Sequence, residues 1–122
     1  MSIIKNTNTE YYFDAEGCYI TELSNSDADT ALSIAQARVA PGVTTAWHRL
    51  VNTTERYCIL SGTGLVEVGE QPAVEVSAGD VVIIEPMQKQ RITNNGQDDL
   101  VFLALCTPRF LPENYQAVAD EA

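Results

Sequence analysis

Short apolar runs, separated by turn-forming residues, are the feature that most limits what this chain can fold into. From residue 44 onward they recur about every 8 to 12 residues, a spacing typical of β-sandwiches and β-barrels. We expect strands at residues 18–23, 31–40, 44–51, 56–60, 65–68, 73–76, 81–84, 90–93 and 100–106. Residues 81–84 form a continuous apolar run, which predicts a strand buried on both faces. The pattern therefore predicts an all-β fold.

Three segments are less clearly patterned. The alanines of residues 31–40 favour a helix, but Leu32, Ile34 and the Pro-Gly stop that follows favour a strand, which we prefer. Residues 11–13 fit either a short strand or a packing clasp. Residues 1–9 are polar and expected to be loose, and the acidic tail from Glu113 is expected to form at most one helical turn.

Chain length sets the number of domains. With 122 residues, of which 45% are hydrophobic, the chain can build one modest core but not two. We expect a single domain over residues 1–122, with a barrel core at about residues 10–106 and extensions at 1–9 and 107–122. The cysteines Cys18, Cys58 and Cys106 are odd in number and widely spaced, which predicts free thiols rather than a disulfide framework.

The formal net charge of -10 narrows the range of partners. Nucleic acids and anionic membrane surfaces are bound through an excess of Lys and Arg, so neither is expected here. No apolar run approaches the roughly 20 residues of a membrane span, and the first residues lack the apolar core of a secretory signal. We therefore expect a cytoplasmic protein.

The only histidine, His48, lies in the run 44–51, and Glu55 comes at the start of the next run. Side chains alternate along a strand, so His48 shares its face with Leu50, and Glu55 shares its face with Tyr57. If the face of His48 is the barrel interior, then His48, Glu55 and Gln90 can surround one small cavity. Their nitrogen, carboxylate and amide oxygen donors suit a divalent ion such as iron, nickel, manganese or zinc.

The spacing of these residues resembles that of the cupins, a family of small antiparallel barrels. The first cupin motif runs Gly, His, His, Glu, Gly, and its intervals are matched here by Gly42, His48, Leu50, Glu55 and Gly62, with Leu50 in place of the second histidine. The second motif runs Gly, Pro, Gly, His, Asn, where this chain has Gly79, Glu85, Met87, Gln90 and Asn94, so only the two ends match. The resemblance implies an antiparallel double-stranded β-helix, or jelly-roll barrel.

The resemblance also implies that His48 and Glu55 are metal ligands, with Gln90 at the position of the family's last histidine. Leu50 occupies another ligand position and cannot coordinate an ion. Two interpretations stay open. The remaining residues either hold a divalent ion with open coordination positions, or form a hydrogen-bonded polar cluster without a metal.

Further candidate residues follow from the same alternation. Tyr57 either donates a hydrogen bond to a substrate oxygen or simply fills space. Because the chain has no second histidine, proton transfer would fall to Glu55, Tyr57 or metal-bound water. Arg38 either clamps a substrate carboxylate or lies at the surface. Trp47 points away from His48 and is a candidate for a dimer interface.

Two functions fit these residues. The first is a metal-dependent enzyme acting on a small oxygen-rich metabolite by dioxygenase, isomerase or decarboxylase chemistry, among which a fold does not choose. The second is a non-catalytic module that binds or senses a small molecule without a metal. The resemblance, together with the large surface of so small a barrel, leads us to expect a homodimer.

Overall fold

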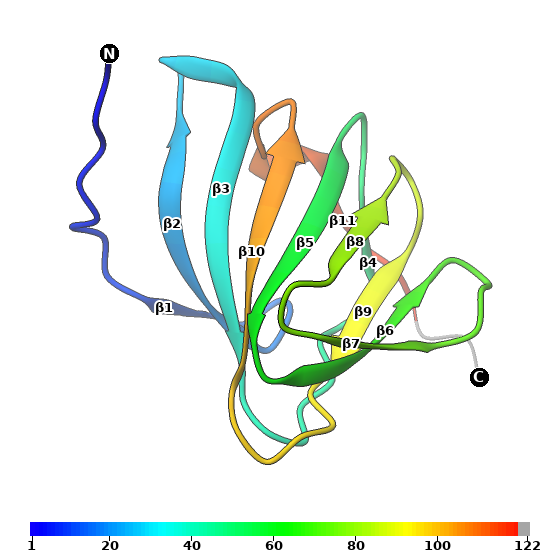
Figure 1. Ribbon diagram of the computed structural model, residues 1–122. Coiled ribbons are helices and arrows are strands. Elements are labelled where there is room, and N and C mark those ends of the chain that lie inside the picture. Colours follow the sequence, from blue (N-terminus) through cyan, green and yellow to red (C-terminus); the bar gives the residue numbers. More distant parts are fainter. Residues whose placement is uncertain (120–122) are drawn as a thin grey trace.

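Two antiparallel sheets face each other in the computed structural model, which describes residues 1–119 of the chain (Figure 1). The first sheet has the strand order β1-β2-β3-β10-β5-β8, and the second has the order β11-β4-β9-β6-β7. The strands are β1 (Tyr11–Phe13), β2 (Cys18–Ser26), β3 (Asp29–Val39), β4 (His48–Leu50), β5 (Thr54–Ser61), β6 (Thr63–Val68), β7 (Val74–Ser77), β8 (Val81–Ile84), β9 (Gln90–Thr93), β10 (Leu100–Thr107) and β11 (Tyr115–Ala117). This arrangement confirms the predicted all-β, antiparallel jelly-roll barrel.

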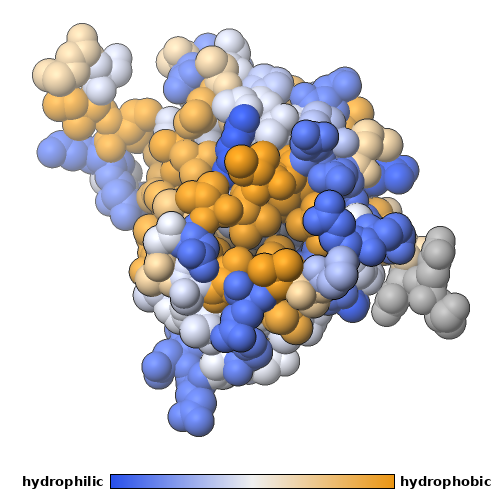
Figure 2. Space-filling view, turned by 45° about the vertical axis from the view of Figure 1, so that its right-hand side comes forward, coloured by the Kyte–Doolittle hydropathy of each residue, from blue (hydrophilic) through white to orange (hydrophobic). Residues whose placement is uncertain are grey.

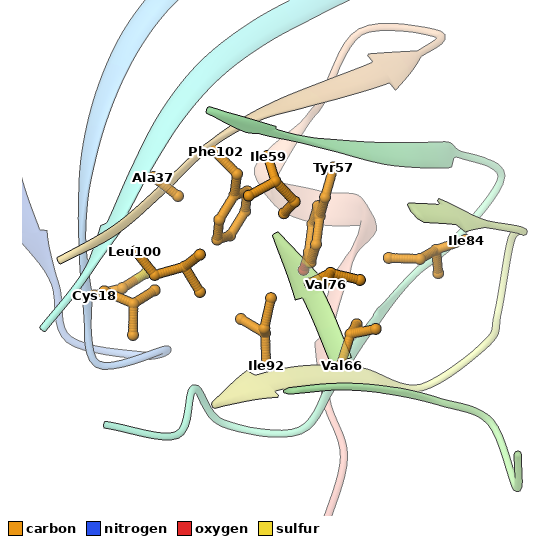
Figure 3. Packing of buried hydrophobic residues seen from close by; sticks show 11 residues of the cluster. Cys18, Ala37, Tyr57, Ile59, Val66, Val76, Ile84, Ile92, Leu100 and Phe102 are labelled. Carbon is orange, nitrogen blue, oxygen red and sulfur yellow. The ribbon is translucent and has the colours of Figure 1, made fainter. Parts of the chain in front are cut away.

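The core lies between the two sheets. Alternate residues of each strand point inward, and their side chains meet in the middle of the barrel (Figure 3). Ile59 from the first sheet and Ile92 from the second are almost fully buried. Each such side chain stabilises the fold by about 1.5–3 kcal/mol relative to an exposed one. The cluster consists of Cys18, Ala37, Val39, Tyr57, Ile59, Val66, Val76, Ile84, Ile92, Leu100 and Phe102.

The ambiguous segment at residues 31–40 is a strand, as predicted. It belongs to β3, which pairs with β2 on one side and with β10 on the other. Ala37 and Val39 point into the core, so the small side chains of this segment make room for their neighbours. Tertiary pairing therefore outweighs the helix propensity of the alanines.

The prediction for residues 81–84 is wrong in one respect. They form β8, but Val81 is 58% exposed and Ile83 is 64% exposed, so the strand is not buried on both faces. The reason is that side chains alternate along the strand, so Val82 and Ile84 face the core while Val81 and Ile83 point to the outer face of the sheet. Exposed apolar residues of β7 and β8 contribute to the patch at the centre of the face shown in Figure 2.

The C-terminal extension differs from the expected loose turn. After β10 it crosses to the second sheet, forms the 3-10 helix η1 (Pro112–Asn114), and ends in β11, which pairs with β4 (Figure 1). Tyr115 is thereby placed opposite Leu50 and close to His48. Within residues 1–119, no helix is long and apolar enough to cross a membrane.

Candidate active site

His48 begins β4 and is 2% exposed. Its backbone position lies opposite Gln90 of β9. The ring atom Nδ1 is 2.8 Å from the carbonyl oxygen of Ala46. A carbonyl only accepts hydrogen bonds, so Nδ1 carries the hydrogen and Nε2 keeps its lone pair. Burial lowers the pKa of His48, which favours this neutral form.

Glu16 lies directly beside the imidazole, with its Oε1 atom 3.4 Å from Nε2 of His48. It belongs to the turn between β1 and β2, where Gly17 adopts a positive φ of 84°. The backbone N–H of Ala46 donates to the carbonyl of Glu16 and ties this turn to the segment before His48. Burial raises the pKa of Glu16 to about 7. A protonated Glu16 can therefore donate its hydrogen to Nε2.

Glu55 is the second carboxyl group of the site; it comes from β5 and is buried, whereas Glu16 is partly buried. Its Oε2 atom accepts a hydrogen bond from the thiol of Cys106 at 3.7 Å, whereas Oε1 is buried without a hydrogen-bond partner. Burial raises its pKa to about 7, and the charge of Glu16 raises it further, against opposing effects of His48 and Gln90. Two carboxyl groups in one site thus hold or release a proton near neutral pH.

Tyr57 and Gln90 form a buried pair beside Glu55. The Tyr57 hydroxyl donates a short hydrogen bond to the amide oxygen of Gln90. Gln90 is close enough to favour the charged form of Glu55, but its Nε2 atom and Glu55 Oε1 do not meet hydrogen-bond geometry. Burial raises the pKa of Tyr57 well above its usual value, so this phenol stays protonated and acts as a donor.

Tyr115 completes the cluster from the C-terminal strand. Its ring stacks on His48, with 5.3 Å between ring centroids and 14° between the planes. The ring of Phe13 also packs against Tyr115, with 5.7 Å between ring centroids and 66° between the planes. The Tyr115 hydroxyl is buried without a hydrogen-bond partner. His48 is thus held between Glu16 and an aromatic ring.

A cavity of about 460 Å³ opens beside these groups. Glu16, Glu55 and Tyr57 line it directly, whereas His48 and Gln90 lie behind its wall. Most of its other lining residues are apolar or aromatic, and they come from β1, β2, β3, β10 and the segment before β11. The volume falls in the range of pockets that hold small metabolites and cofactors.

The structure brings four of the predicted site residues together and leaves the fifth outside. His48, Glu55, Tyr57 and Gln90 converge, as the alternation of side chains predicts. Arg38 instead stacks on Tyr19 and forms salt bridges at the surface, so it does not line the cavity. The acceptors of those salt bridges are Glu10 and Asp99.

Sequence reasoning missed Glu16 and Tyr115. An acidic residue in a turn between two barrel strands was the only available signal for Glu16, and nothing marked Tyr115.

Trp47 does lie on the outer face, where Lys89 and Arg91 pack over its ring.

The donor set does not suit the predicted divalent ion. Within residues 1–119, no three His, Cys, Asp or Glu side chains are grouped so that they could hold a metal ion. The amide oxygen of Gln90 already accepts from Tyr57, and Leu50 contributes no donor. Of the predicted ligands, this leaves one imidazole and one carboxylate, fewer than the three or four protein ligands typical of zinc sites. These residues therefore do not make a metal site of the predicted kind.

Comparisons with known proteins agree with this architecture. The family model for the cupin domain matches residues 35–106. An uncharacterised protein of Methanocaldococcus jannaschii is 32% identical over 121 residues, which cover 93% of this chain and 94% of that protein.

Many solved structures are similar in fold, and two of them serve as examples. A predicted oxalate decarboxylase of Thermotoga maritima has a TM-score of 0.78 at 23% identity and covers 88% of this chain and 99% of its own. The Streptomyces nucleoside dehydratase Pac13 has a TM-score of 0.78 at 16% identity and covers 97% of this chain and 91% of its own.

Proposed function

The chain belongs to the cupin family, and we propose that its barrel binds a small oxygen-bearing metabolite and catalyses proton transfer on it. The observation that carries this proposal is that two carboxyl groups, the partly buried Glu16 and the buried Glu55, line one cavity, where desolvation raises the pKa of each to about 7. At neutral pH, such a pair supplies one group that accepts a proton and one that donates it. Both side chains line the cavity, where they can reach a bound molecule.

The surrounding residues have supporting roles in this proposal. The ionised carboxylate takes a proton from the substrate, and the protonated carboxyl group returns one to another atom of it. This transfer fits an isomerisation or an elimination of water. His48 is a positioning residue that shares a proton with Glu16, since it lies behind the cavity wall. Tyr57 lines the cavity and orients Gln90 against Glu55.

Likeness of fold gives this proposal limited support. Pac13 is named as a nucleoside dehydratase, and dehydration is an acid–base reaction. At 16% identity, the roles of individual residues in Pac13 cannot be assigned to residues of this chain.

A metal-dependent reaction is the other form of the proposal. It would use His48 and Glu55 as ligands, with iron, nickel, manganese or zinc as the ion. It has less support, because the donor set falls short of a metal site. Metal analysis of the purified protein tests it: stoichiometric metal that is lost in His48→Ala would favour it over the acid–base proposal.

A non-catalytic binding module is the second candidate function. Glu55 and Tyr115 line the cavity, and each carries an oxygen without a hydrogen-bond partner in the fold, which is costly unless a bound molecule supplies one. A sensor or accessory protein needs such groups as much as an enzyme does. Only turnover separates the two functions.

Incubation with a metabolite extract tests the proposal. Mass spectrometry should show one or a few compounds consumed by the wild-type protein in the presence of a chelator, and not by Glu55→Gln or Glu16→Gln. Glu75→Gln is the matched control, because this carboxylate is exposed on β7. Compounds that are bound but never consumed would support the binding module, and consumption that continues in both active-site variants would refute the acid–base role.

We also propose that the protein is a cytoplasmic homodimer that binds neither nucleic acid nor membranes. The acidic net charge supports the expectation that the protein binds neither nucleic acid nor membranes, because both are negatively charged. The edge strand β8 supports the dimer, since Val81 and Ile83 are exposed and β8 pairs with β5 alone among the described strands. Cell fractionation tests the location, and recovery of the protein with membranes would contradict it.

A further inference from the structure

We infer that the cavity selects uncharged or cationic ligands that carry a hydrogen-bond donor, and rejects carboxylates and phosphates. This inference names the substrate class of the site and rests on the proposed function only in taking the cavity as the ligand site. It goes against the anionic substrate that the oxalate decarboxylase fold relatives would suggest.

The charges around the cavity are all of one sign. Glu16, Glu22 and Glu55 line it, and none of its lining residues is Lys or Arg. His48 lies behind the wall and is held in its neutral form by burial. An anion entering this space would meet repulsion from each ionised carboxylate and no compensating cation.

Arg56, Arg109 and Arg38 do not add a cation to the cavity. Arg56 stands between Glu55 and Tyr57 on β5, so its side chain points to the opposite face and donates hydrogen bonds to Thr54 and Thr107. Arg109 approaches the mouth through Asn25, whose Oδ1 accepts from its Nε at 2.8 Å, but its Nη1 is engaged with Asp27. Arg38 is held by Glu10 and Asp99 outside the barrel. The carboxylates that face Arg109 and Arg38 balance their charges, so the cavity gains little positive potential from them.

The apolar walls make the exclusion stronger. Phe13, Ile20, Phe102 and Phe110 offer no dipoles to replace the water that an anion would lose on entry. Electrostatic interactions also strengthen where water is excluded, so a carboxylate–carboxylate contact here costs more than at the surface. A neutral ligand escapes both penalties.

Two polar atoms without hydrogen-bond partners, on Glu55 and Tyr115, also favour a ligand that donates hydrogen bonds. Glu55 Oε1 is an acceptor whenever this carboxyl group is ionised, and it lies in a side chain that is 9% exposed. A ligand O–H or N–H satisfies it, whereas a carboxylate or phosphate oxygen places a second acceptor against it. The Tyr115 hydroxyl can either accept or donate, so it fits a hydroxyl or amide group on the same ligand.

Matched pairs of small molecules test the inference. The probes are amides and their carboxylates, such as nicotinamide and nicotinate, and uridine with uridine 5′-monophosphate, titrated at about pH 8 so that the acids are ionised. Calorimetry or ligand-observed NMR should show the neutral member binding at least tenfold more tightly, about 1.4 kcal/mol. The difference in affinity between the neutral and the anionic probe should become smaller in Glu55→Gln, which removes the negative charge and keeps the shape of the side chain.

Two variants establish that the measured binding occurs in the cavity. Ala35→Leu adds a side chain to the cavity wall from β3 and should weaken binding of the neutral probes. Gln36→Leu adds the same side chain at the next position, which faces the other way, and should leave binding unchanged.

The possible outcomes separate this inference from the proposed function. Cavity-dependent binding in which the anionic members are as tight as the neutral ones, or tighter, overturns the inference while leaving the cavity as a ligand site. No cavity-dependent binding by any member of the panel contradicts both. A charge preference that persists undiminished in both Glu55→Gln and Glu16→Gln also overturns the inference, because the carboxylates would then not be its cause.

Discussion

At the scale of single residues, Glu16 and Glu55 should make the protein less stable as the pH rises. An unfolded glutamate loses its proton near pH 4.5, whereas these two hold theirs to about pH 7. Between these values the two carboxyl groups bind more protons in the folded state than in the unfolded state, so their contribution to the free energy of unfolding falls with rising pH and levels off above about pH 7. The loss is at most about 3 kcal/mol for each group.

Urea unfolding across this range of pH measures the effect. Glu55→Gln and Glu16→Gln should each flatten the decline, because a neutral amide has no proton to lose. Glu75→Gln, on an exposed position of β7, should leave the slope unchanged. The same slope in the wild-type protein and in both Glu55→Gln and Glu16→Gln would show that these carboxyl groups are ionised in the fold, since the lowered pKa of His48 contributes an opposing rise equally to all three.

His48 should remain neutral, with its hydrogen on Nδ1, at pH values where a free histidine is half protonated. Burial lowers its pKa, and the Ala46 carbonyl at 2.8 Å fixes the tautomer. Nitrogen-15 NMR reads both properties without ambiguity, because the chain contains a single histidine. The urea-unfolded protein is the control and should titrate near pH 6.5. A folded-state imidazolium at that pH would contradict the proposed proton sharing with Glu16.

The sequence could supply part of this site, for a reason that lies in strand geometry. Alternation along a strand is a local rule, so the convergence of His48, Glu55 and Gln90 follows once the strands are paired. Glu16 obeys no such rule. Its direction depends on the positive φ of Gly17 and on a backbone hydrogen bond from Ala46, which lies far away in sequence.

At the scale of elements, the turns that join the strands depend on two kinds of glycine. Gly42 and Gly62 both have positive φ, at 79° and 83°, so alanine is strained at either position. A Cβ atom at Gly62 would also lie 2.6 Å from the carbonyl oxygen of Asp99, whereas none at Gly42 would meet an atom within 4 Å. Backbone atoms cannot move aside as a flexible side chain can.

Gly62→Ala should therefore destabilise the protein more than Gly42→Ala. We expect about 1 kcal/mol at Gly42 from strain alone, and about 2 kcal/mol more at Gly62, because the loop before β10 must shift. Paired urea titrations give the difference, in which the strain common to both positions cancels. Equal losses would show that the Asp99 segment yields freely.

The elements that were misjudged from the sequence share one cause. The apolar run of β8 indicated burial, but burial depends on whether another layer covers each face of the sheet, and Val81 and Ile83 point to the outer face. The strand β11 has no apolar run of its own and forms because β4 offers it a pairing edge. Neither fact can be read from the residues of the element itself, since each depends on neighbours that are distant in sequence.

At the scale of the whole molecule, net charge and surface pattern act in opposite directions. A charge of -10 keeps copies of the chain apart. The exposed edge at β8 carries no charged side chain and offers unpaired backbone groups, which favours pairing with another strand. Two copies related by a two-fold axis can place β8 against β8, so that each exposed side chain meets its counterpart.

Light scattering should accordingly find a dimer, of about twice 13.3 kDa, at micromolar concentration. A stable interface buries roughly 800 Å² on each partner, more than a four-residue strand covers, so Leu60 and Val74 beside β8 should join it. Ile83→Lys would place a charge at its centre and should give monomers. Ile4→Lys is the matched control, because Ile4 is similarly exposed, at 60% against 64% for Ile83, and lies near the N-terminus. A monomeric wild-type protein would refute the dimer, and a dimer that survives Ile83→Lys would move the interface to another face, with the outer surface around Trp47 as the next to test.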